Sequence, residues 1–426
     1  MSIQNGEESF RVEHASWQTG KTLIKDTVTT MPAAQPDSES PLNKEADRNI
    51  KDPVRYMLWG RSAGRCQFDG CNKPVWKSEL TQEILNLAEA AHIYSFNEGG
   101  PRGNKGVKRE LINSADNLLL VCRGCHKTID DRGTEYRYSV DLLRTWKRSH
   151  ENRVELVTEI APGKKSHVLL YGAAIDNVDV SVDVDQASAA MFPRRYPADR
   201  HPIQLGTLGQ ADRDYEADYW TTQGKLLQRN FQQRVTERLQ AGQIQHLSIF
   251  ALAPQPLLIL LGSLIVDLVE ADVYQRHREP QPSWSWPDQS SSPRIQIRRP
   301  ERPSKTRIPV LVLSLSASIG RERISSAIEA TPEIWEVTVD GPHNDIIKSP
   351  ADLSNFRSAV RPLFDEIKLI YGQDTPLHVF PAAPASCNVE LGRIRMPKAH
   401  QPWIVYDQNN RTNGFVPALR IGDQDE

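Results

Sequence analysis

The chain has 426 residues, with 52 Lys and Arg against 54 Asp and Glu, for a formal net charge of −2. At roughly 100–200 residues per domain, this length predicts two or three domains. A charge so close to zero excludes a protein that coats nucleic acid through bulk positive charge. Hydrophobic residues at 38% and 29 prolines indicate long loops around cores of ordinary size.

The most apolar stretch, Leu257–Val266, is interrupted by Gly262 and Ser263. It is far shorter than the roughly 20 residues that a membrane-spanning helix needs. The start of the chain has no apolar segment typical of a secretion signal. We therefore expect a cytoplasmic protein with no membrane contact.

Residues 1–50 are polar and without apolar periodicity, which predicts a disordered arm. Cysteines, histidines and basic residues are concentrated over 51–160, where helical periodicity is found at 51–62 and 139–158. Ala161-Pro162-Gly163 then indicates a linker. The predicted domains after the arm are therefore 51–160 and 161–426.

The region 161–426 alternates strand-like and helix-like segments. The predicted buried strands are His167–Ile175 and Ile308–Ser316, and the longest predicted helices are Tyr219–Ala241 and Asp352–Tyr371. The Pro-, Ser- and Arg-rich stretch Pro280–Pro303 is predicted to be a loop that joins two halves, about 165–290 and 291–426.

An internal repeat supports these two halves. The pattern F-x-x-A-P-x6-L-G is found at 250–262 and again at 380–392. Each copy follows an apolar run and precedes a second strand-like segment, which predicts a strand, a helix started by Pro and another strand, twice. A duplicated βαβ unit implies two parallel-sheet lobes, with a ligand outside the carboxyl ends of the strands. The repeated residues are Phe250, Ala253, Pro254, Leu261 and Gly262, then Phe380, Ala383, Pro384, Leu391 and Gly392.

Four of the five cysteines form two close pairs, Cys66 with Cys71 and Cys122 with Cys125. In a cytosolic chain this clustering favours a metal site over disulfides. Four thiolates complete the tetrahedral shell of one Zn²⁺ and leave no open position, so the ion would be structural. Four reduced cysteines in a core are the alternative.

A second set of polar residues lies between and beside these pairs. His92 precedes a Gly-rich loop, Asn117 precedes the apolar run into Cys122, and His126 directly follows the C-x2-C pair. This order of His, Asn and His over about residues 60–135 resembles the HNH endonuclease family. The resemblance implies a ββα-metal fold and metal-dependent hydrolysis of DNA phosphodiesters.

The resemblance also implies a role for each residue. His92 would be the general base, Asn117 would orient the base or its loop, and His126 would hold one divalent ion, Mg²⁺ or Mn²⁺. Asp130 lies four residues beyond His126 on the same helix face and could share that ion, and Glu89 is close in sequence. Ala91 stands where many members carry a metal ligand, which leaves the full ligand set open.

Several basic residues of this region are candidates for contacts to DNA phosphates, or are simply solvated surface charges. They are Arg102, Lys105, Lys108, Arg109, Lys147 and Arg148. No segment has the character of a base-reading element, so we expect little sequence specificity.

Residues 246–286 and 376–407 resemble the SAVED domain, a sensor of two fused CARF-like Rossmann units. The matching segments are HLSIFALAPQPLLILLG, DVYQRHR, HVFPAAP, LGRIRMPK and WIVYD. An HNH domain joined to SAVED resembles the effector endonucleases of cyclic-oligonucleotide-based anti-phage signalling (CBASS). The resemblance implies that SAVED binds a cyclic oligonucleotide, such as the dinucleotide cGAMP, made by a partner enzyme. The protein, a dimer at rest, would then assemble into a tetramer or larger homo-oligomer and cut double-stranded DNA.

Such a ligand needs aromatic faces for its bases and basic or hydroxyl groups for its phosphates. The candidates are Trp284, Trp286, Tyr274, Arg276, Arg278, Ser316 and Ser318 in the first part, and Phe380, Arg393, Lys398 and Tyr406 in the second. For Phe380, Tyr274 and Tyr406, packing between strand and helix is the competing interpretation.

The sequence thus predicts an α+β multidomain protein, with an N-terminal HNH domain that includes a zinc knuckle and a C-terminal α/β SAVED domain. One alternative is an HNH restriction endonuclease whose C-terminal half recognises modified DNA. That half carries no excess of basic residues, which counts mildly against this alternative. A DNA-binding zinc knuckle without enzymatic activity is the other alternative, and it leaves His92 and Asn117 unexplained.

Overall fold

The computed structural model describes residues 49–104, 106–133, 135–206, 213–216, 218–287, 292–409, 411 and 414–422. Residues 1–48 of the predicted arm, and Lys105, lie outside the described residues. None of the described helices combines the length and the apolar character that crossing a membrane requires.

The N-terminal region is built on an antiparallel pair of strands followed by a helix. Strands β1 and β2 pair with His92 opposite Leu118, and α3 starts directly after β2. Apolar side chains of β2 and the neighbouring helices, including Leu58, Leu119, Ile129 and Leu143, form one buried core. The elements in chain order are α1 (Asp52–Ser62), β1 (Ala88–His92), α2 (Arg109–Ile112), η1 (Ala115–Asn117), β2 (Leu118–Cys122), α3 (Arg123–Asp130), η2 (Glu135–Arg137) and α4 (Val140–Thr158).

Local signals explain where the two longer helices of this region start and stop. Pro53 stands in the first turn of α1, and Ala63 ends this helix in the left-handed conformation, with φ at 52°. Ser139 caps α4 because its hydroxyl accepts the Leu142 N–H at 3.2 Å. The helices expected at 51–62 and 139–158 are thereby confirmed.

The C-terminal region contains two sheets with parallel centres. In the first sheet the strand order is β4-β3-β6-β7, all parallel, with β5 also paired to β3. Its elements are η3 (Pro162–Lys164), β3 (Lys165–Gly172), α5 (Val184–Met191), β4 (Tyr196–Pro197), β5 (Ile203–Gln204), α6 (Tyr219–Phe231), η4 (Gln232–Thr236), α7 (Glu237–Gln240), β6 (His246–Leu252), α8 (Gln255–Ile265) and β7 (Glu270–Val273).

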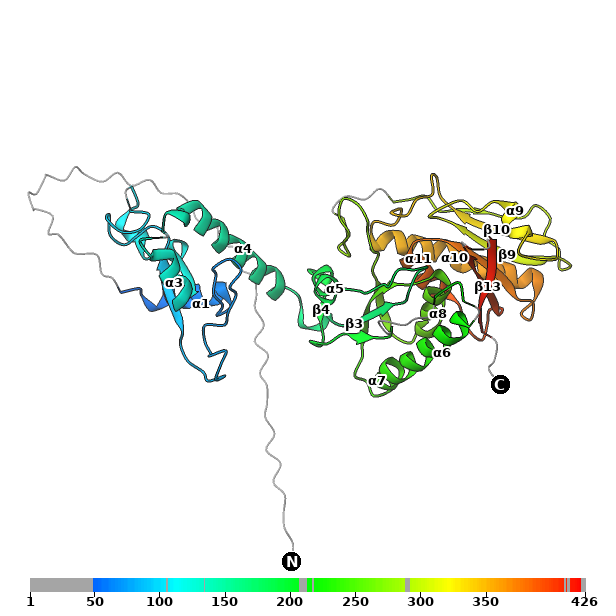
Figure 1. Cartoon of the computed structure of the whole chain (residues 1–426), viewed down its shortest axis with the longest axis horizontal. Coiled ribbons are helices and arrows are strands. Elements are labelled where there is room, and N and C mark those ends of the chain that lie inside the picture. Colours follow the sequence, from blue (N-terminus) through cyan, green and yellow to red (C-terminus); the bar gives the residue numbers. More distant parts are fainter. Residues whose placement is uncertain are drawn as a thin grey trace, which may run out of the picture. The chain divides into compact units, whose positions relative to one another are not determined.

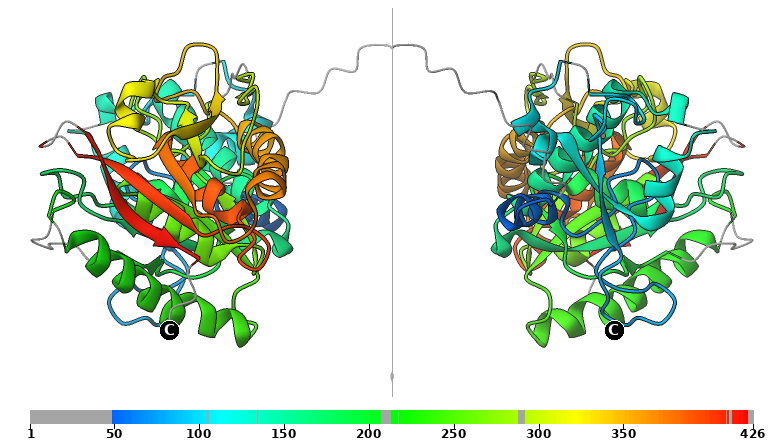
Figure 2. Two further views of the ribbon diagram at one scale, coloured as in Figure 1. Left: turned by 90° about the vertical axis from the view of Figure 1, so that its right-hand side faces the viewer. Right: turned by 90° about the vertical axis from the view of Figure 1, so that its left-hand side faces the viewer.

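The second sheet has the order β13-β12-β11-β9-β10-β8, parallel from β12 to β10 and antiparallel at both edges. Figure 2 shows its long β12–β13 pair in red. The elements are β8 (Gln296–Arg298), β9 (Ile308–Ser314), α9 (Arg321–Ser325), β10 (Pro332–Thr338), α10 (Pro350–Tyr371), β11 (Leu377–Ala382), α11 (Ala385–Ile394), β12 (Trp403–Asn409) and β13 (Gly414–Ile421).

The predicted duplication is confirmed as two βαβ units, β6-α8-β7 and β11-α11-β12. Their helices cross at the two repeated glycines. A Cβ atom on Gly262 would lie 2.0 Å from the Val389 carbonyl oxygen, and one on Gly392 would lie 2.0 Å from the Ile259 carbonyl oxygen. Both copies of the repeat therefore have a glycine at the point where the two helix backbones touch, and this contact joins the two sheets.

Two predicted segments differ in detail from the structure. The helix expected at Tyr219–Ala241 is one rod made of α6, a π-helical turn η4 and α7, as Figure 1 shows. The loop expected at Pro280–Pro303 contains the edge strand β8, which pairs with β10 through Ile297 and Val337. Three residues are too short for periodicity to reveal a strand.

Candidate functional sites

The four clustered cysteines form a compact site. Their Sγ atoms all lie within 4.8 Å of one another, and those of Cys71 and Cys122 are 4.0 Å apart. Four sulfurs around Zn²⁺ at bonds of about 2.3 Å would lie about 3.8 Å apart. The backbone N–H of Cys122 also donates to the sulfur of Cys66 at 3.3 Å. This donor set fits a closed, structural Zn²⁺ site.

The pKa values of the clustered cysteines also indicate a site that needs a bound cation. Burial raises the pKa of the Cys66 thiol to about 12 and raises the pKa of Cys125, whereas burial at Cys122 is outweighed by hydrogen bonds, which lower the pKa of this thiol. Neighbouring thiolates repel one another, so the four groups ionise together only with a cation between them. Cys122 and Cys125 bracket the start of α3, and an ion held here would anchor the helix that carries His126.

His92 ends β1, and Asn117 holds the segment that follows it. The amide oxygen of Asn117 accepts the Tyr94 N–H at 2.9 Å, and its amide nitrogen donates to the Tyr94 carbonyl at 3.0 Å and the Ile112 carbonyl at 2.8 Å. His92 Nε2 lies 2.9 Å from the Asn113 side-chain oxygen. An amide oxygen only accepts, so Nε2 carries the proton and Nδ1 is left to receive one.

His126 and Asp130 meet on α3, where Nε2 of the histidine lies 3.3 Å from a carboxylate oxygen. Both side chains are about one-third exposed, so water and a phosphate can reach them. Glu89 lies on the strand face opposite His92 and pairs with Arg123 at 3.3 Å. Across the described ranges, the cysteine cluster is the one set of three or more ligand groups gathered this closely. The structure therefore brings together His126 and Asp130 and leaves Glu89 outside a three-ligand set.

The hydrogen bond between His126 and Asp130 favours the charged form of both side chains. The hydrogen bond to Asp130 raises the pKa of His126 above its ordinary value, against the opposing effect of burial. Burial alone would raise the pKa of Asp130, but hydrogen bonds from His126 and Arg102 outweigh it and lower this pKa. The carboxylate is thus charged, with one oxygen in contact with Arg102 and the other in contact with His126.

The candidate phosphate contacts fall into different environments. Arg102 is buried and pairs with Asp130 at 2.7 Å, and Lys147 is buried and pairs with Glu151. Both side chains form internal ion pairs, which is neither of the two alternatives, phosphate contact or solvated surface charge, that the sequence offered for them. Lys108, Arg109 and Arg148 are exposed.

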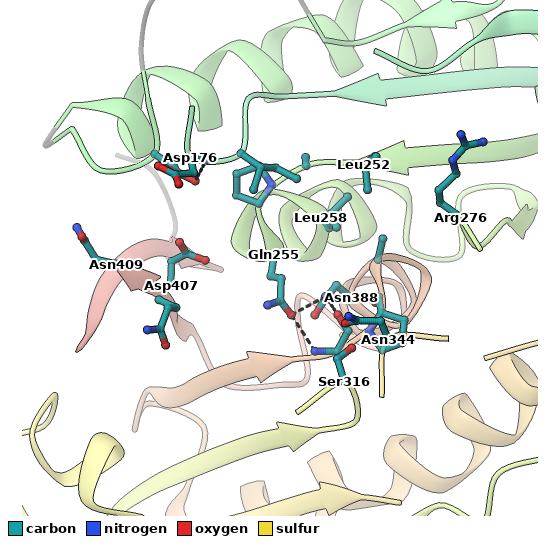
Figure 3. Close-up of a pocket in the computed structure, with 18 of the residues that line it drawn as sticks. Asp176, Leu252, Gln255, Leu258, Arg276, Ser316, Asn344, Asn388, Asp407 and Asn409 are labelled. Atoms are coloured by element: carbon teal, nitrogen blue, oxygen red, sulfur yellow. Dashed lines mark hydrogen bonds between the residues drawn. The ribbon is translucent and has the colours of Figure 1, made fainter. Parts of the chain in front are cut away.

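A pocket of about 410 Å³ lies where the parallel strands of both sheets end. Figure 3 shows Asp176, Asp407 and Asn409 at one end of it and Arg276 at the other. Pockets for small ligands have volumes of about 300–1,000 Å³. Residues of both lobes line this pocket, which lies at the carboxyl ends of the parallel strands, where the sequence predicted a ligand. The polar lining residues include Asp176, Asp214, Gln255, Gln275, Arg276, Arg278, Ser316, Asn344, Asn388, Asp407, Asn409 and Arg411.

The starts of α8 and α11 are tied together at the centre of this pocket. The side-chain oxygen of Gln255 accepts from the Ala383 N–H and from Asn388 Nδ2, both at 2.9 Å (Figure 3). Gln275 similarly accepts from the N–H and hydroxyl of Ser386 at 3.2 and 2.7 Å. Two glutamines of the first lobe therefore hold the first turn of the helix in the second.

The acidic end of the pocket is unusual. Burial raises the pKa of Asp407 to about 7, and the charge of Asp214 contributes to this rise. Burial also raises the pKa of Asp214, although its carboxylate accepts the Asp176 N–H at 2.8 Å. Arg411 also lines this end, with its guanidinium 3.4 Å from the centroid of the Tyr215 ring, so the carboxyl groups here have a cation beside them.

Of the predicted ligand contacts, the structure brings Arg276, Arg278 and Ser316 to this pocket. Phe380 and Tyr406 are buried and stacked with centroids 4.2 Å apart, as are Phe250 and Tyr274 at 4.3 Å. These pairs are repeated packing elements, one in each lobe.

The remaining predicted contacts lie elsewhere. Trp284 is 2% exposed and packs its ring against Phe250, with the Arg276 guanidinium 5.6 Å from its centroid. Arg393 is held by Glu390 at 3.0 Å. Trp286 lies 6.1 Å from the ring of Tyr274. Ser318 and Lys398 are exposed and do not line the pocket.

Sequence reasoning missed the amides and carboxylates of the pocket. Gln255 directly follows the repeated Ala-Pro, and Asp407 directly follows Tyr406 at the end of the last repeated strand. Their positions at strand ends were the available signal, because polar residues there face the crevice of an α/β sheet.

Comparisons with known families agree with both motif sets. The family described as "HNH endonuclease" matches residues 66–133, and the family described as "SMODS-associated and fused to various effectors sensor domain" (SAVED) matches residues 227–421. A search of curated proteins found no match.

Solved structures also resemble the chain. A Cap4 SAVED/CARF-domain containing receptor from Acinetobacter baumannii with the cyclic trinucleotide 2′3′3′-cAAA is 11% identical, with a TM-score of 0.38 over 70% of this chain and 61% of that one. The same receptor with 3′3′3′-cAAA is 12% identical, with a TM-score of 0.37 over 66% and 59%. The receptor from Moraxella osloensis is 10% identical, with a TM-score of 0.36 over 74% and 70%. The chain thus spans about three-fifths of the first two solved chains.

Both family matches coincide with the motifs from which they were predicted. The chain therefore combines an HNH endonuclease domain with a SAVED domain.

Proposed function

We propose that this protein is an anti-phage effector that cuts double-stranded DNA when a cyclic oligonucleotide occupies its SAVED pocket. The observation that carries the proposal is the presence, in one chain, of a His–Asn–His centre and a two-lobed polar pocket. Neither feature alone distinguishes a signalling effector from a simple nuclease or a simple receptor.

In the proposed cleavage reaction, His92 accepts a proton from the attacking water through Nδ1. Asn117 keeps the following loop in place so that this nitrogen faces the substrate. His126 and Asp130 would hold Mg²⁺ or Mn²⁺, which when bound stabilises charge on the phosphate and the leaving oxygen. Glu89 is a third ligand only if it leaves Arg123.

In the proposed ligand complex, phosphates lie toward Arg276 and Arg278 and the starts of the two repeated helices. N–H groups of the bases face Asp407 and its acidic neighbours. Ser316 is within the same lining and can donate to a phosphate or ribose. A cyclic dinucleotide such as cGAMP carries both kinds of group, and a cyclic trinucleotide does so as well.

We further propose that the ligand drives assembly of a resting dimer into a tetramer or larger homo-oligomer in the cytoplasm. Cutting both DNA strands in one encounter would use two HNH centres, and the HNH match of this chain, residues 66–133, supplies one. The zinc site would serve the fold of each HNH domain and take no part in the chemistry.

Digestion of supercoiled plasmid with Mg²⁺ or Mn²⁺, in the presence of a panel of cyclic di- and trinucleotides, tests the proposal. We expect degradation with one ligand and none without. Cutting independent of every ligand would contradict control by a ligand and favour a restriction enzyme. Such an enzyme would cut methylated and unmodified plasmids at different rates. Binding of plasmid without cutting would favour the zinc-knuckle module.

A further inference from the structure

Arg102 lies in the Gly-rich loop between β1 and α2, ten residues beyond His92. Its side chain is only 5% exposed, although the loop around it is at the surface. The residue adopts a φ of 64°, a conformation that side chains other than glycine rarely adopt. The long cationic side chain of Arg102 is thus buried although its backbone lies in a loop, and the unusual φ has a conformational cost.

The guanidinium binds two elements at once. Toward the end of β1, Nη2 donates to the His92 carbonyl at 2.9 Å and Nε to the Ile93 carbonyl at 2.7 Å. Toward the end of α3, Nη1 donates to the Ile129 carbonyl at 3.0 Å and Nη2 to the Asp130 carboxylate at 2.7 Å. All three guanidinium nitrogens are used.

The four acceptors belong to the two parts of the proposed centre. One pair is the backbone of the base residue and its neighbour, and the other pair is the last turn of the helix that carries His126. Carbonyls at the end of a helix lack helical partners and favour a positive charge. Asn117 then holds Tyr94, so that three successive residues, beginning with the last residue of β1, are each fixed by a side chain.

We infer that Arg102 is a positioning residue that sets the base-bearing strand and the metal-bearing helix at a fixed separation. This inference rests on the proposed nuclease function and adds a residue to it. The three nitrogens of the Arg102 guanidinium donate to four acceptors that lie in two directions. A lysine has a single side-chain nitrogen and cannot replace them, so the fork shape of arginine is required. Its action is through His92 and Asp130, without contact to DNA.

The full-length variants R102A and R102K test the inference, with R109A as the control for an exposed phosphate contact. In R102A and R102K, with the cyclic oligonucleotide that activates the wild type in the plasmid assay, we expect the single-turnover cleavage rate at saturating DNA to fall at least about 100-fold. Affinity for Mn²⁺ alone, by calorimetry without DNA, should fall by roughly 10-fold because Asp130 loses its support. Affinity for a short duplex in Ca²⁺ should stay within about 3-fold, with the same salt dependence. In R109A, the slope of log affinity against log salt should fall by about one.

Two results would overturn the inference. The first is recovery of the wild-type rate by R102K, and the second is a reduced salt slope in R102A like that of R109A. Zinc content and thermal melting establish that each variant is folded, and R102K decides the matter should R102A not fold. A wild type that cuts no DNA with any cyclic oligonucleotide of the panel would defeat the proposed function instead, and the Mn²⁺ affinity and salt slope would still decide the role of Arg102.

Discussion

Single side chains in this protein take their roles from partners that are distant in sequence. Arg102 is 28 residues from Asp130, and Gln255 is 133 residues from Asn388. The sequence therefore predicts the chemical type of a site residue better than its environment. His92, Asn117 and His126 were named from the order of a motif, and their catalytic roles remain predictions. The burial of Trp284 could not, because a Pro- and Ser-rich loop contains no periodicity to reveal its inner face.

The first prediction concerns His246, at the start of β6. Burial lowers its pKa to about 4, and the charges of Arg195 and Arg393 add to this effect against that of Asp272. An unfolded chain binds the proton at a pKa near 6.5, so folding stability is full above that value and is lost as the pH falls toward 4.

Urea unfolding at several pH values from 7.5 to 5 measures this effect. We expect the unfolding midpoint to fall with pH, and to fall less in H246Q, which cannot gain a charge. H246Q should keep part of the pH dependence, because burial also lowers the pKa of other histidines, including His277 and His400. An identical pH dependence in wild type and H246Q would contradict the assigned role.

At the scale of elements, the repeat was the most informative feature of the sequence. Its phenylalanines, prolines and glycines predicted both βαβ units, and the structure supplies the physical reason for the glycines. The pairing of β8 and the joining of the two helices by Gln255 could not be predicted, since both depend on contacts between distant segments. The bounds of α4 and α10 were predicted closely, and in both helices a serine caps the first turn.

The second prediction tests the crossing of α8 and α11. Replacing Gly262 or Gly392 by Ala places a methyl group against a backbone carbonyl that cannot move alone. We expect a loss of about 2–3 kcal/mol in the free energy of unfolding, typical of overpacking. In the control variant G224A, the new methyl group meets the ends of the Leu419 and Leu260 side chains at 3.2 and 3.6 Å. Equal effects of all three substitutions by chemical denaturation would contradict the close crossing.

The third prediction tests the zinc site as a support for α3. We expect full-length C66S, and the wild type treated with a strong chelator, to lose about one Zn²⁺ per chain by elemental analysis. The HNH domain should then become sensitive to protease and lose cleavage, because the structural ion holds the fold together. C387S changes a buried cysteine outside the cluster and should retain its zinc. Retention of zinc by C66S would contradict the assignment.

For the whole molecule, the central claim is that a ligand in one domain controls chemistry in the other. The two sites share no residue, since the HNH match ends at 133 and the pocket begins at Ile175. Variants can therefore separate binding from cutting. Composition and motifs predicted both domains, but neither the polar lining of the pocket nor the burial of the Arg102 side chain follows from composition.

The measurement that tests this claim most directly compares H92A with the pocket variant R278A, each as the full chain. Ligand affinity is measured by calorimetry with the activating cyclic oligonucleotide, and plasmid cutting is measured across ligand concentrations. We predict that H92A keeps its ligand affinity within about 2-fold and loses cutting by a factor of about 10²–10⁴, as expected for a lost general base. R278A should bind at least about 10-fold more weakly and require correspondingly more ligand for the same rate of cutting. Cutting by R278A without any shift in its ligand requirement, or cutting by H92A at the wild-type rate, would contradict the account.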